Sequence, residues 1–137
     1  MTTNKACIIP TIHYKNAKSA IEWLCAAFGF EKRLVVPGED NTIIHAQLTY
    51  RNSMLMVSSE NDNEYGKLVK APNSLNGINT QAPFIIVEKI DAHYKNAIAK
   101  GAEVLLENKD QAYGGRGYTC KDIEGHIWNF GSYDPWE

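Results

Sequence analysis

The sequence has few cysteines, and they follow neither a metal-binding nor a disulfide pattern. Cys7, Cys25 and Cys120 are odd in number and far apart, and no Cys-x-x-Cys or Cys-x-x-His spacing occurs. A disulfide framework uses an even set of cysteines, and a structural zinc site uses closely paired ligands. Neither is expected here, and we interpret the three thiols as reduced core residues of a cytoplasmic protein.

Long apolar runs and an excess of one charge are also missing. No stretch approaches the roughly 20 apolar residues that span a bilayer, and the N-terminal MTTNKACIIPTIHYKN lacks the apolar core of a signal peptide. The formal net charge is −2, without a long basic run. Surfaces that bind nucleic acid or anionic membranes need such a run. We therefore expect no nucleic acid and no membrane as partner, and a cytoplasmic location.

The remaining composition is that of an ordinary folded domain. The chain has 137 residues, of which 44% are hydrophobic and 22% charged, enough for one domain with a real core. We predict a single domain over 1–137, built from a first module at 1–59, a linker at 60–81 and a second module at 82–137. The linker is polar and rich in Asn and Gly, which is typical of functional lids or mobile segments.

Each module shows the same order of elements. In the first, CIIPTIHY (7–14) predicts a strand, and NAKSAIEWLCAAFGF has apolar residues at helical spacing between an N-cap Asn16 and a stop at Gly29. The strand EKRLVV and a hairpin over 41–59 follow. In the second, APFIIVEK is followed by the helix IDAHYKNAIAK ending at Gly101, the strand EVLLEN, the turn QAYGGRG, and the strands YTCKD and HIWNFGSY across the turn DIEG.

The order β-α-β-β-β therefore occurs twice. Half of the chain alone would leave one sheet face uncovered, so the two modules are expected to pack together. The predicted fold class is α+β, with two tandem β-α-β-β-β modules forming curved mixed sheets around a groove.

This duplicated order resembles the vicinal oxygen chelate superfamily, which includes glyoxalase I, extradiol dioxygenases and bleomycin-resistance proteins. Three stretches carry the likeness: IIPTIHYKNAKSAIEWLCAAFGFEKR, HAQLTYRNSMLMVS and YGGRGYTCKDIEGHIWNFGSYDPW. They are most similar to the PhnB-type and bleomycin-resistance-like branches. Ile123 stands where the family usually has Pro, but Asp122 and Gly125 still supply the turn chemistry.

The resemblance implies four places for metal ligands, which metal-dependent members fill with His or Glu. Carried over to this chain, they fall near Ile9, Gln47, Ala82 and Asn129. The Ile and Ala side chains cannot bind a divalent metal, and neutral amides are weak ligands beside carboxylate or imidazole. We predict no metal site and no cofactor, with a divalent metal kept as the alternative.

Two histidines of the first module leave a second hypothesis open. Period-2 alternation puts His45 on the face of Gln47, and His13 on the face of Ile9. They are either ligands of a displaced metal site or hydrogen-bonding residues of the groove. We favour the second, because a metal site needs at least three ligands. His93 falls on the second helix and is expected near the surface.

The stretch KDIEGHIWNFGSYDPW crowds a histidine, acidic residues and aromatics together. His126 is either a ligand or general base, or a turn residue that packs where the last strand begins. We favour the second, because in the resembling family this His belongs to the fold signature. Trp128 alternates with Asn129 and is expected in the core, and Trp136 is expected to pack against a partner chain or the last strand.

The other predicted ligand-binding residues lie around the Gly-rich turn and at the amide positions. Arg116 either orients an anionic ligand or ties the turn down, and Tyr113 and Tyr118 flank it. Gln47 and Asn129 each offer a donor and an acceptor, as polar anchors of a mostly apolar pocket do. Cys120 has no obvious activating base, so a nucleophile is not expected.

These observations leave two functional hypotheses. The first is a metal-free protein that binds a small amphipathic or aromatic molecule in its groove, through His13, His45, Gln47, Tyr113, Arg116, Tyr118 and Asn129. The second is a metal-dependent lyase, isomerase or dioxygenase. The resemblance also implies a homodimer, in which halves of two chains complete each groove.

Overall fold

Two modules of the same order make up the structure, a computed structural model that describes residues 5–137. In the first module the elements are β1 (Thr11–Tyr14), α1 (Ala17–Phe28), β2 (Glu31–Pro37), β3 (Ile43–Tyr50) and β4 (Ser53–Ser59). A connection that contains the 3₁₀ helix η1 (Pro72–Leu75) leads to the second module. There the elements are β5 (Phe84–Ile86), α2 (Ile90–Ala99), β6 (Glu103–Asp110), β7 (Arg116–Lys121) and β8 (Ile127–Gly131).

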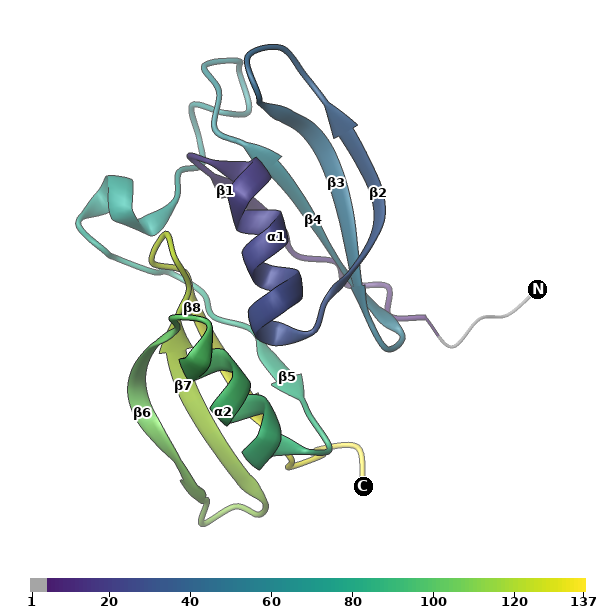
Figure 1. Ribbon diagram of the computed structural model, residues 1–137, viewed down its shortest axis with the longest axis vertical. Helices are drawn as coiled ribbons and strands as arrows, with labels where there is room; N and C mark the ends of the chain where they lie inside the picture. The colour runs from purple at the N-terminus through teal and green to yellow at the C-terminus, as the bar shows by residue number, and fades with distance from the viewer. Residues whose placement is uncertain (1–4) are drawn as a thin grey trace.

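The strands form two separate four-stranded sheets, with orders β1-β4-β3-β2 and β5-β8-β7-β6. In each sheet the first strand pairs in parallel with the last, and the other pairs are antiparallel. Each second strand carries a bulge at a corresponding place, between Lys32 and Leu34 and between Val104 and Leu106. The predicted α+β class and the tandem modules are confirmed, but the two sheets do not close around a groove within the chain (Figure 1).

The first strand is shorter than the pattern of 7–14 predicts. It begins at Thr11, directly after Pro10. Proline has no backbone N–H to donate to a ladder, so its place is at or before a strand end. Its carbonyl still accepts from the backbone N–H of Met56 at 2.9 Å.

Helix α1 forms where the sequence places a cap, an apolar stripe and a stop. The side chain of Asn16 accepts from the backbone N–H of Ser19 at 3.2 Å, and Gly29 ends the helix at φ 85°. That left-handed conformation costs glycine little. One face of the helix is buried against the first sheet: Ala17, Ala20, Ile21, Leu24, Ala27 and Phe28.

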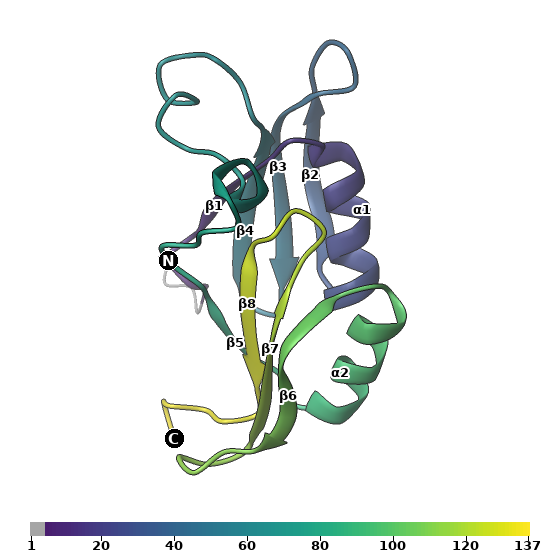
Figure 2. The same cartoon turned by 90° about the vertical axis from the view of Figure 1, so that its left-hand side faces the viewer.

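Both helices lie on the same side of the sheets (Figure 2). A side chain of α2 hydrogen-bonds to the last carbonyl groups of α1. Asn96 donates through Nδ2 to the carbonyls of Ala26 and Ala27, at 2.9 and 3.1 Å. The last carbonyls of a helix have no partner within it. These bonds therefore satisfy acceptors that the short first module leaves open.

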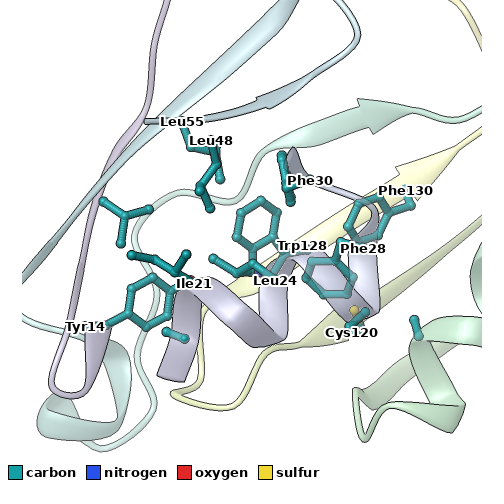
Figure 3. Close-up of a cluster of buried hydrophobic side chains, with 14 of the residues drawn as sticks. Tyr14, Ile21, Leu24, Phe28, Phe30, Leu48, Leu55, Cys120, Trp128 and Phe130 are labelled. Atoms are coloured by element: carbon teal, nitrogen blue, oxygen red, sulfur yellow. The ribbon is translucent and has the colours of Figure 1, made fainter. Parts of the chain in front are cut away.

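The hydrophobic core runs from one module into the other. The ring of Phe28 lies 5.4 Å from that of Trp128 and 4.7 Å from that of Phe130 (Figure 3). Trp128 is fully buried, as its alternation with Asn129 predicts. Aromatic pairs at such separations stabilise a core beyond the area they bury. Within residues 5–137, neither helix is long and apolar enough to cross a bilayer.

Candidate functional site

Each sheet has one face covered by its helix and one face turned away, which we call the open face. Residues directly opposite each other on neighbouring strands point to the same side. In the first sheet Ala46, Leu48 and Val57 are buried on the helix side. The alternate residues lie on the open face: Thr11, His13, Leu34, Val36, His45, Gln47, Met54, Met56 and Ser58.

Two hydrogen-bonded pairs form a polar patch on this open face. Nε2 of His13 lies 3.2 Å from Oγ of Ser58, directly across the β1–β4 ladder. The amide of Gln47 lies 3.1 Å from Nε2 of His45, which accepts from the amide N–H₂. Thus His45 and Gln47 share a face, as the alternation of the sequence predicts. We call Thr11, His13, His45, Gln47 and Ser58 the polar patch.

His13 is the most enclosed member of the patch, with 7% of its surface exposed. Burial lowers the pKa of its imidazole, while the nearby charge of Glu60 acts in the opposite direction. A neutral imidazole offers one donor and one acceptor rather than a positive charge. The patch can therefore hydrogen-bond uncharged groups.

Tyr65, from the segment that follows β4, covers this end of the patch. Its ring centroid lies 5.6 Å from that of His13, and its hydroxyl lies 3.5 Å from Oγ1 of Thr11. About half of Tyr65 remains exposed. Neither Tyr65 nor Ser58 stood out in the sequence. The alternation along β4 could have placed Ser58, whereas no periodicity exists in the polar linker.

Asn129 lies on the open face of the other sheet. Its Oδ1 accepts from the hydroxyl of Thr119 at 2.7 Å, and its Nδ2 lies 3.4 Å from the carbonyl oxygen of Pro83. Phe84 and Thr119 are its neighbours across the ladders. This amide is thus held by its own sheet, apart from the polar patch.

Arg116 and Tyr118 lie on the helix side of the second sheet. Arg116 donates from Nε to Asp91 at 3.0 Å and from Nη1 to Asp110 at 2.9 Å, so it ties β7 to α2 and β6. Tyr118 is 3% exposed, and burial raises the pKa of its hydroxyl. Arg116 was expected either to orient an anionic ligand or to tie the turn down, and these contacts are those of the second role.

Tyr113 is exposed at the Gly-rich turn, where its ring lies 5.0 Å from that of Tyr133. The predicted ligand-binding residues therefore fall into separate places. His13, His45 and Gln47 come together, whereas Tyr113, Arg116, Tyr118 and Asn129 do not join them.

His93, which we expected near the surface, is partly buried at the module junction. Its Nε2 donates to the carbonyl of Phe28 at 2.9 Å, and its Nδ1 accepts from the hydroxyl of Tyr118 at 2.7 Å. Burial lowers the pKa of His93. Because α2 packs beside α1, the face of α2 that carries this histidine is turned to the module junction.

His126 also lies at the module junction, directly before β8 and against β1. Its Nε2 donates to the backbone carbonyl of His13 at 3.0 Å, and its own backbone N–H donates to Oδ1 of Asp122 at 3.0 Å. The imidazole packs edge-on against the ring of Tyr14, with the centroids 4.8 Å apart. These contacts are those of a turn residue that holds the start of β8.

The places to which the resemblance carries the metal ligands, near Ile9, Gln47, Ala82 and Asn129, hold side chains that offer no imidazole and no carboxylate, the strong ligands of divalent ions. Gln47 pairs with Met56 across the β3–β4 ladder, and Asn129 pairs with Phe84 and Thr119 in the second sheet. Across residues 5–137, no group of three or more His, Cys, Asp or Glu side chains is placed to hold a metal.

Gln47 and Asn129 occupy different strands of their modules. Gln47 lies on β3 and pairs with Met56 on β4, whereas Asn129 lies on β8 and pairs with Thr119 on β7. The counterpart of Asn129 is therefore Met56, and that of Gln47 is Thr119. The sequence of a hairpin alone does not indicate which of its two strands pairs with the first strand of the module.

A cavity of about 580 Å³ lies at the module junction, away from the polar patch. Met54 and Phe84, both on open faces, contribute to its wall. The other lining residues come from the N-terminal segment, the β3–β4 turn, β5 and the C-terminal tail, among them Ile8, Pro10, Arg51, Ile86 and Trp136. The polar patch itself lies on an open sheet face rather than inside this cavity.

Solved structures share this architecture. The crystal structure of TioX from Micromonospora sp. ML1 superposes with a TM-score of 0.73 at 27% identity, covering 92% of this chain and 97% of that one. A putative 3-demethylubiquinone-9 3-methyltransferase, PhnB protein, from Bacillus cereus superposes with a TM-score of 0.64 at 15% identity, covering 92% and 98%. At that identity the second match shows the fold alone.

Sequence comparison leads to the same group. An uncharacterized protein of Mycobacterium bovis is 30% identical over 122 residues, which cover 89% of this chain and 80% of the relative. The family model of the Glyoxalase/Bleomycin resistance protein/Dioxygenase superfamily matches residues 10–130. The chain therefore belongs to the Glyoxalase/Bleomycin resistance protein/Dioxygenase superfamily.

Proposed function

We propose that this protein binds a small amphipathic or aromatic molecule on the open face of its first sheet, without a metal ion. The polar patch carries this proposal, because two hydrogen-bonded pairs there lie among apolar side chains. Met56 and Leu34 flank Gln47 on either side along one cross-strand row. A few placed polar groups within an apolar surface are the usual composition of a small-molecule site.

The polar patch favours a ligand that both donates and accepts hydrogen bonds. Hydroxyl, amide and imidazole groups can act as donor or acceptor, and no member of the patch carries a fixed charge. The apolar borders of the patch contact the hydrophobic part of the ligand. Thr119 and Asn129 offer a smaller hydroxyl–amide pair on the second sheet.

We also propose that the protein is a homodimer that encloses this face. Apolar side chains on the open faces stay uncovered within the chain, with Leu34 43%, Phe84 41% and Leu106 61% exposed. Trp136 is 91% exposed, so it does not cover the last strand, and the role of dimer contact stays a prediction. Exposed apolar area of this kind marks interaction sites. Sedimentation that shows only a 15.4 kDa monomer at micromolar concentration would count against the dimer.

The alternative is a metal-dependent lyase, isomerase or dioxygenase of the same superfamily. The observation that favours it is the presence of His13 and His45 on one open face. Each imidazole already has a partner, Ser58 or Gln47, and no carboxylate among residues 5–137 hydrogen-bonds to either. A metal at this place would need ligands from outside the polar patch.

Metal analysis and thermal shifts separate the two functions. Protein purified without added metal is analysed for bound ions, then melted with Ni²⁺, Zn²⁺, Mn²⁺ or Fe²⁺ and with a library of small aromatic compounds. A ligand that binds the native state raises the melting temperature by mass action. We expect aromatic compounds, and not metals, to raise it in the wild type but much less in the double variant His45→Ala, Gln47→Ala.

The control for this experiment is Lys95→Ala, on the exposed side of α2, which should respond like the wild type. A stoichiometric ion that is lost in His13→Ala and His45→Ala would overturn the metal-free function. Stabilisation by compounds that is unchanged in the double variant would place their binding elsewhere.

A further inference from the structure

Glu60 holds the two ends of segment 61–70 together through hydrogen bonds. The backbone N–H of Glu60 donates to the carbonyl of Tyr14 at 2.9 Å, which fixes the start of the segment to β1. Its Oε2 accepts from the backbone N–H of Ala71 at 2.6 Å, which fixes the end. Residues 61–70 therefore leave the sheet and return at one point. In Figure 2 this connection projects on the side of the sheets away from the helices.

The segment has its own internal support. The side chain of Asn61 accepts from the N–H of Asn63 at 3.1 Å, and that of Asn63 accepts from the N–H of Gly66 at 2.7 Å. The N–H of Leu68 donates to the carbonyl of Tyr65 at 2.9 Å. These local bonds give a turn that presents Tyr65 without help from the sheet.

Tyr65 rests on the sheet through weak contacts. Its hydroxyl is 3.5 Å from Oγ1 of Thr11, at the long limit of a hydrogen bond, and its ring is tilted 47° to that of His13. The other part of the ring faces solvent, since about half of the residue is exposed. The ring thus covers one end of the polar patch and leaves an aromatic surface free beside it.

We infer that Tyr65 is a movable wall of the ligand site and makes it selective for planar aromatic molecules that carry a hydrogen-bonding group. This inference rests on the proposed function and names its substrate class. A flat ring stacks on Tyr65, while its polar group reaches the polar patch. Stacking on an aromatic wall favours a planar ring over a saturated ring of the same size. Because only the weak contacts of Tyr65 join the middle of segment 61–70 to the sheet, the segment moves with the ring to admit the ligand.

A matched pair of probes tests the selectivity. 2-Naphthol and decahydro-2-naphthol have the same carbon skeleton and hydroxyl, and only the first is planar. We expect 2-naphthol to shift the amide NMR signals of residues on the open face and to bind at least tenfold more tightly than decahydro-2-naphthol. In Tyr65→Ala the difference should fall to less than threefold, whereas Tyr65→Phe should keep it. Leu68→Ala, an exposed change on the same segment, is the control.

The outcomes separate this inference from the proposed function. The role of Tyr65 is overturned if 2-naphthol binds the open face equally well in Tyr65→Ala. It is also overturned if 2-naphthol does not bind at millimolar concentration. In both cases the proposed function is still tested by the thermal-shift screen of aromatic compounds. Binding that shifts only signals away from the open face overturns both. Equal affinity for the two probes in the wild type overturns the selectivity for planar rings.

A measurement without ligand checks the cover itself. In Tyr65→Ala the imidazole of His13 should become more exposed, and its NMR titration should move toward the ordinary pKa of a histidine. The other groups that act on His13, namely Glu60, His126 and Lys70, are not removed by this substitution. An unchanged His13 titration would show that Tyr65 does not cover His13 in solution, and would overturn the inference.

Discussion

Tyr14 donates its hydroxyl hydrogen to Oδ2 of Asp122 at 2.6 Å, and so joins the first strand of one module to the last turn of the other. The same oxygen accepts from Nε1 of Trp128 at 3.0 Å. Burial, and then the charge of Asp122, raise the pKa of Tyr14. The buried carboxylate is thus the central acceptor of the module junction, and the turn DIEG is a structural joint.

Neighbouring bonds extend this joint to the start of α1. The carboxylate of Glu124 accepts from the backbone N–H groups of Lys15 and Asn16, at 2.6 and 2.8 Å. Oδ1 of Asp122 in turn accepts from the backbone N–H of Glu124 at 2.9 Å. One turn of the second module therefore positions the strand-to-helix connection of the first.

Replacing Asp122 by Ala should lower the free energy of unfolding by about 3 kcal/mol, because it leaves buried donors of Tyr14 and Trp128 without an acceptor. Urea denaturation of both proteins measures the difference. Asp62→Asn, an exposed change, is the control and should stay within about 0.5 kcal/mol of wild type. A loss below 1 kcal/mol in Asp122→Ala would contradict the central role of this carboxylate.

Stability should fall as the pH is lowered from 7.5 to 5.5. Burial lowers the pKa of both His13 and His93 in the folded state, whereas in the unfolded chain a histidine titrates at about 6.5. Below that value the unfolded state binds protons that the folded state does not, so their contribution is present at neutral pH and is lost on acidification.

Urea denaturation at several pH values measures this slope. His13→Asn should make it shallower, because one of the two groups is removed. Stability that is constant, or that rises toward pH 5.5, would contradict the lowered pKa values.

The three thiols should react in the order of their exposure. Cys7 is exposed, Cys25 is partly buried and Cys120 is fully buried, and burial raises the pKa of Cys120 to about 12. Since the thiolate is the reacting species, a disulfide reagent at pH 8 should modify Cys7 first and Cys120 only on unfolding in urea. Equal rates at the three positions in the native protein would refute this order.

Cutting the chain within segment 61–70 should leave the two modules associated. The shared core and the Asp122 joint hold them without this connection, and its internal bonds are local. A protease site inserted between Gly66 and Lys67 allows the cut. Gel filtration of the cut protein should show the elution volume of the intact protein. Separate fragments at micromolar concentration would mean that the junction is weaker than its contacts indicate.

The sequence was sufficient where local rules decide the outcome. Asn16 and Gly29 set the ends of α1, and the alternation of His45 with Gln47 gave their common face. The same alternation assigns Arg116 and Tyr118 to a face of the sheet only when the first residue of β7 is known. Because β7 already begins at Arg116, both side chains share the helix-covered side with Cys120.

Other positions depend on how distant elements pack, which no local pattern states. His93 lies at the junction only because α2 packs beside α1. The counterpart of Asn129 could be identified only from strand order, since both strands of each hairpin look alike in sequence. Tyr65 reaches His13 through the fold of a polar segment that has no periodicity.

The parallel pairing of the first and last strand of each module also constrains how the protein is made. β8 lies between β5 and β7, and it carries Trp128 and Phe130 into the core. Tyr14 meets Asp122 across 108 residues of chain. On the ribosome, the contact of Tyr14 at the module junction therefore cannot form until the chain has been made as far as Asp122. A chain that stops before residue 127 lacks an inner strand of its second sheet, and quality-control proteases should recognise it as unfinished.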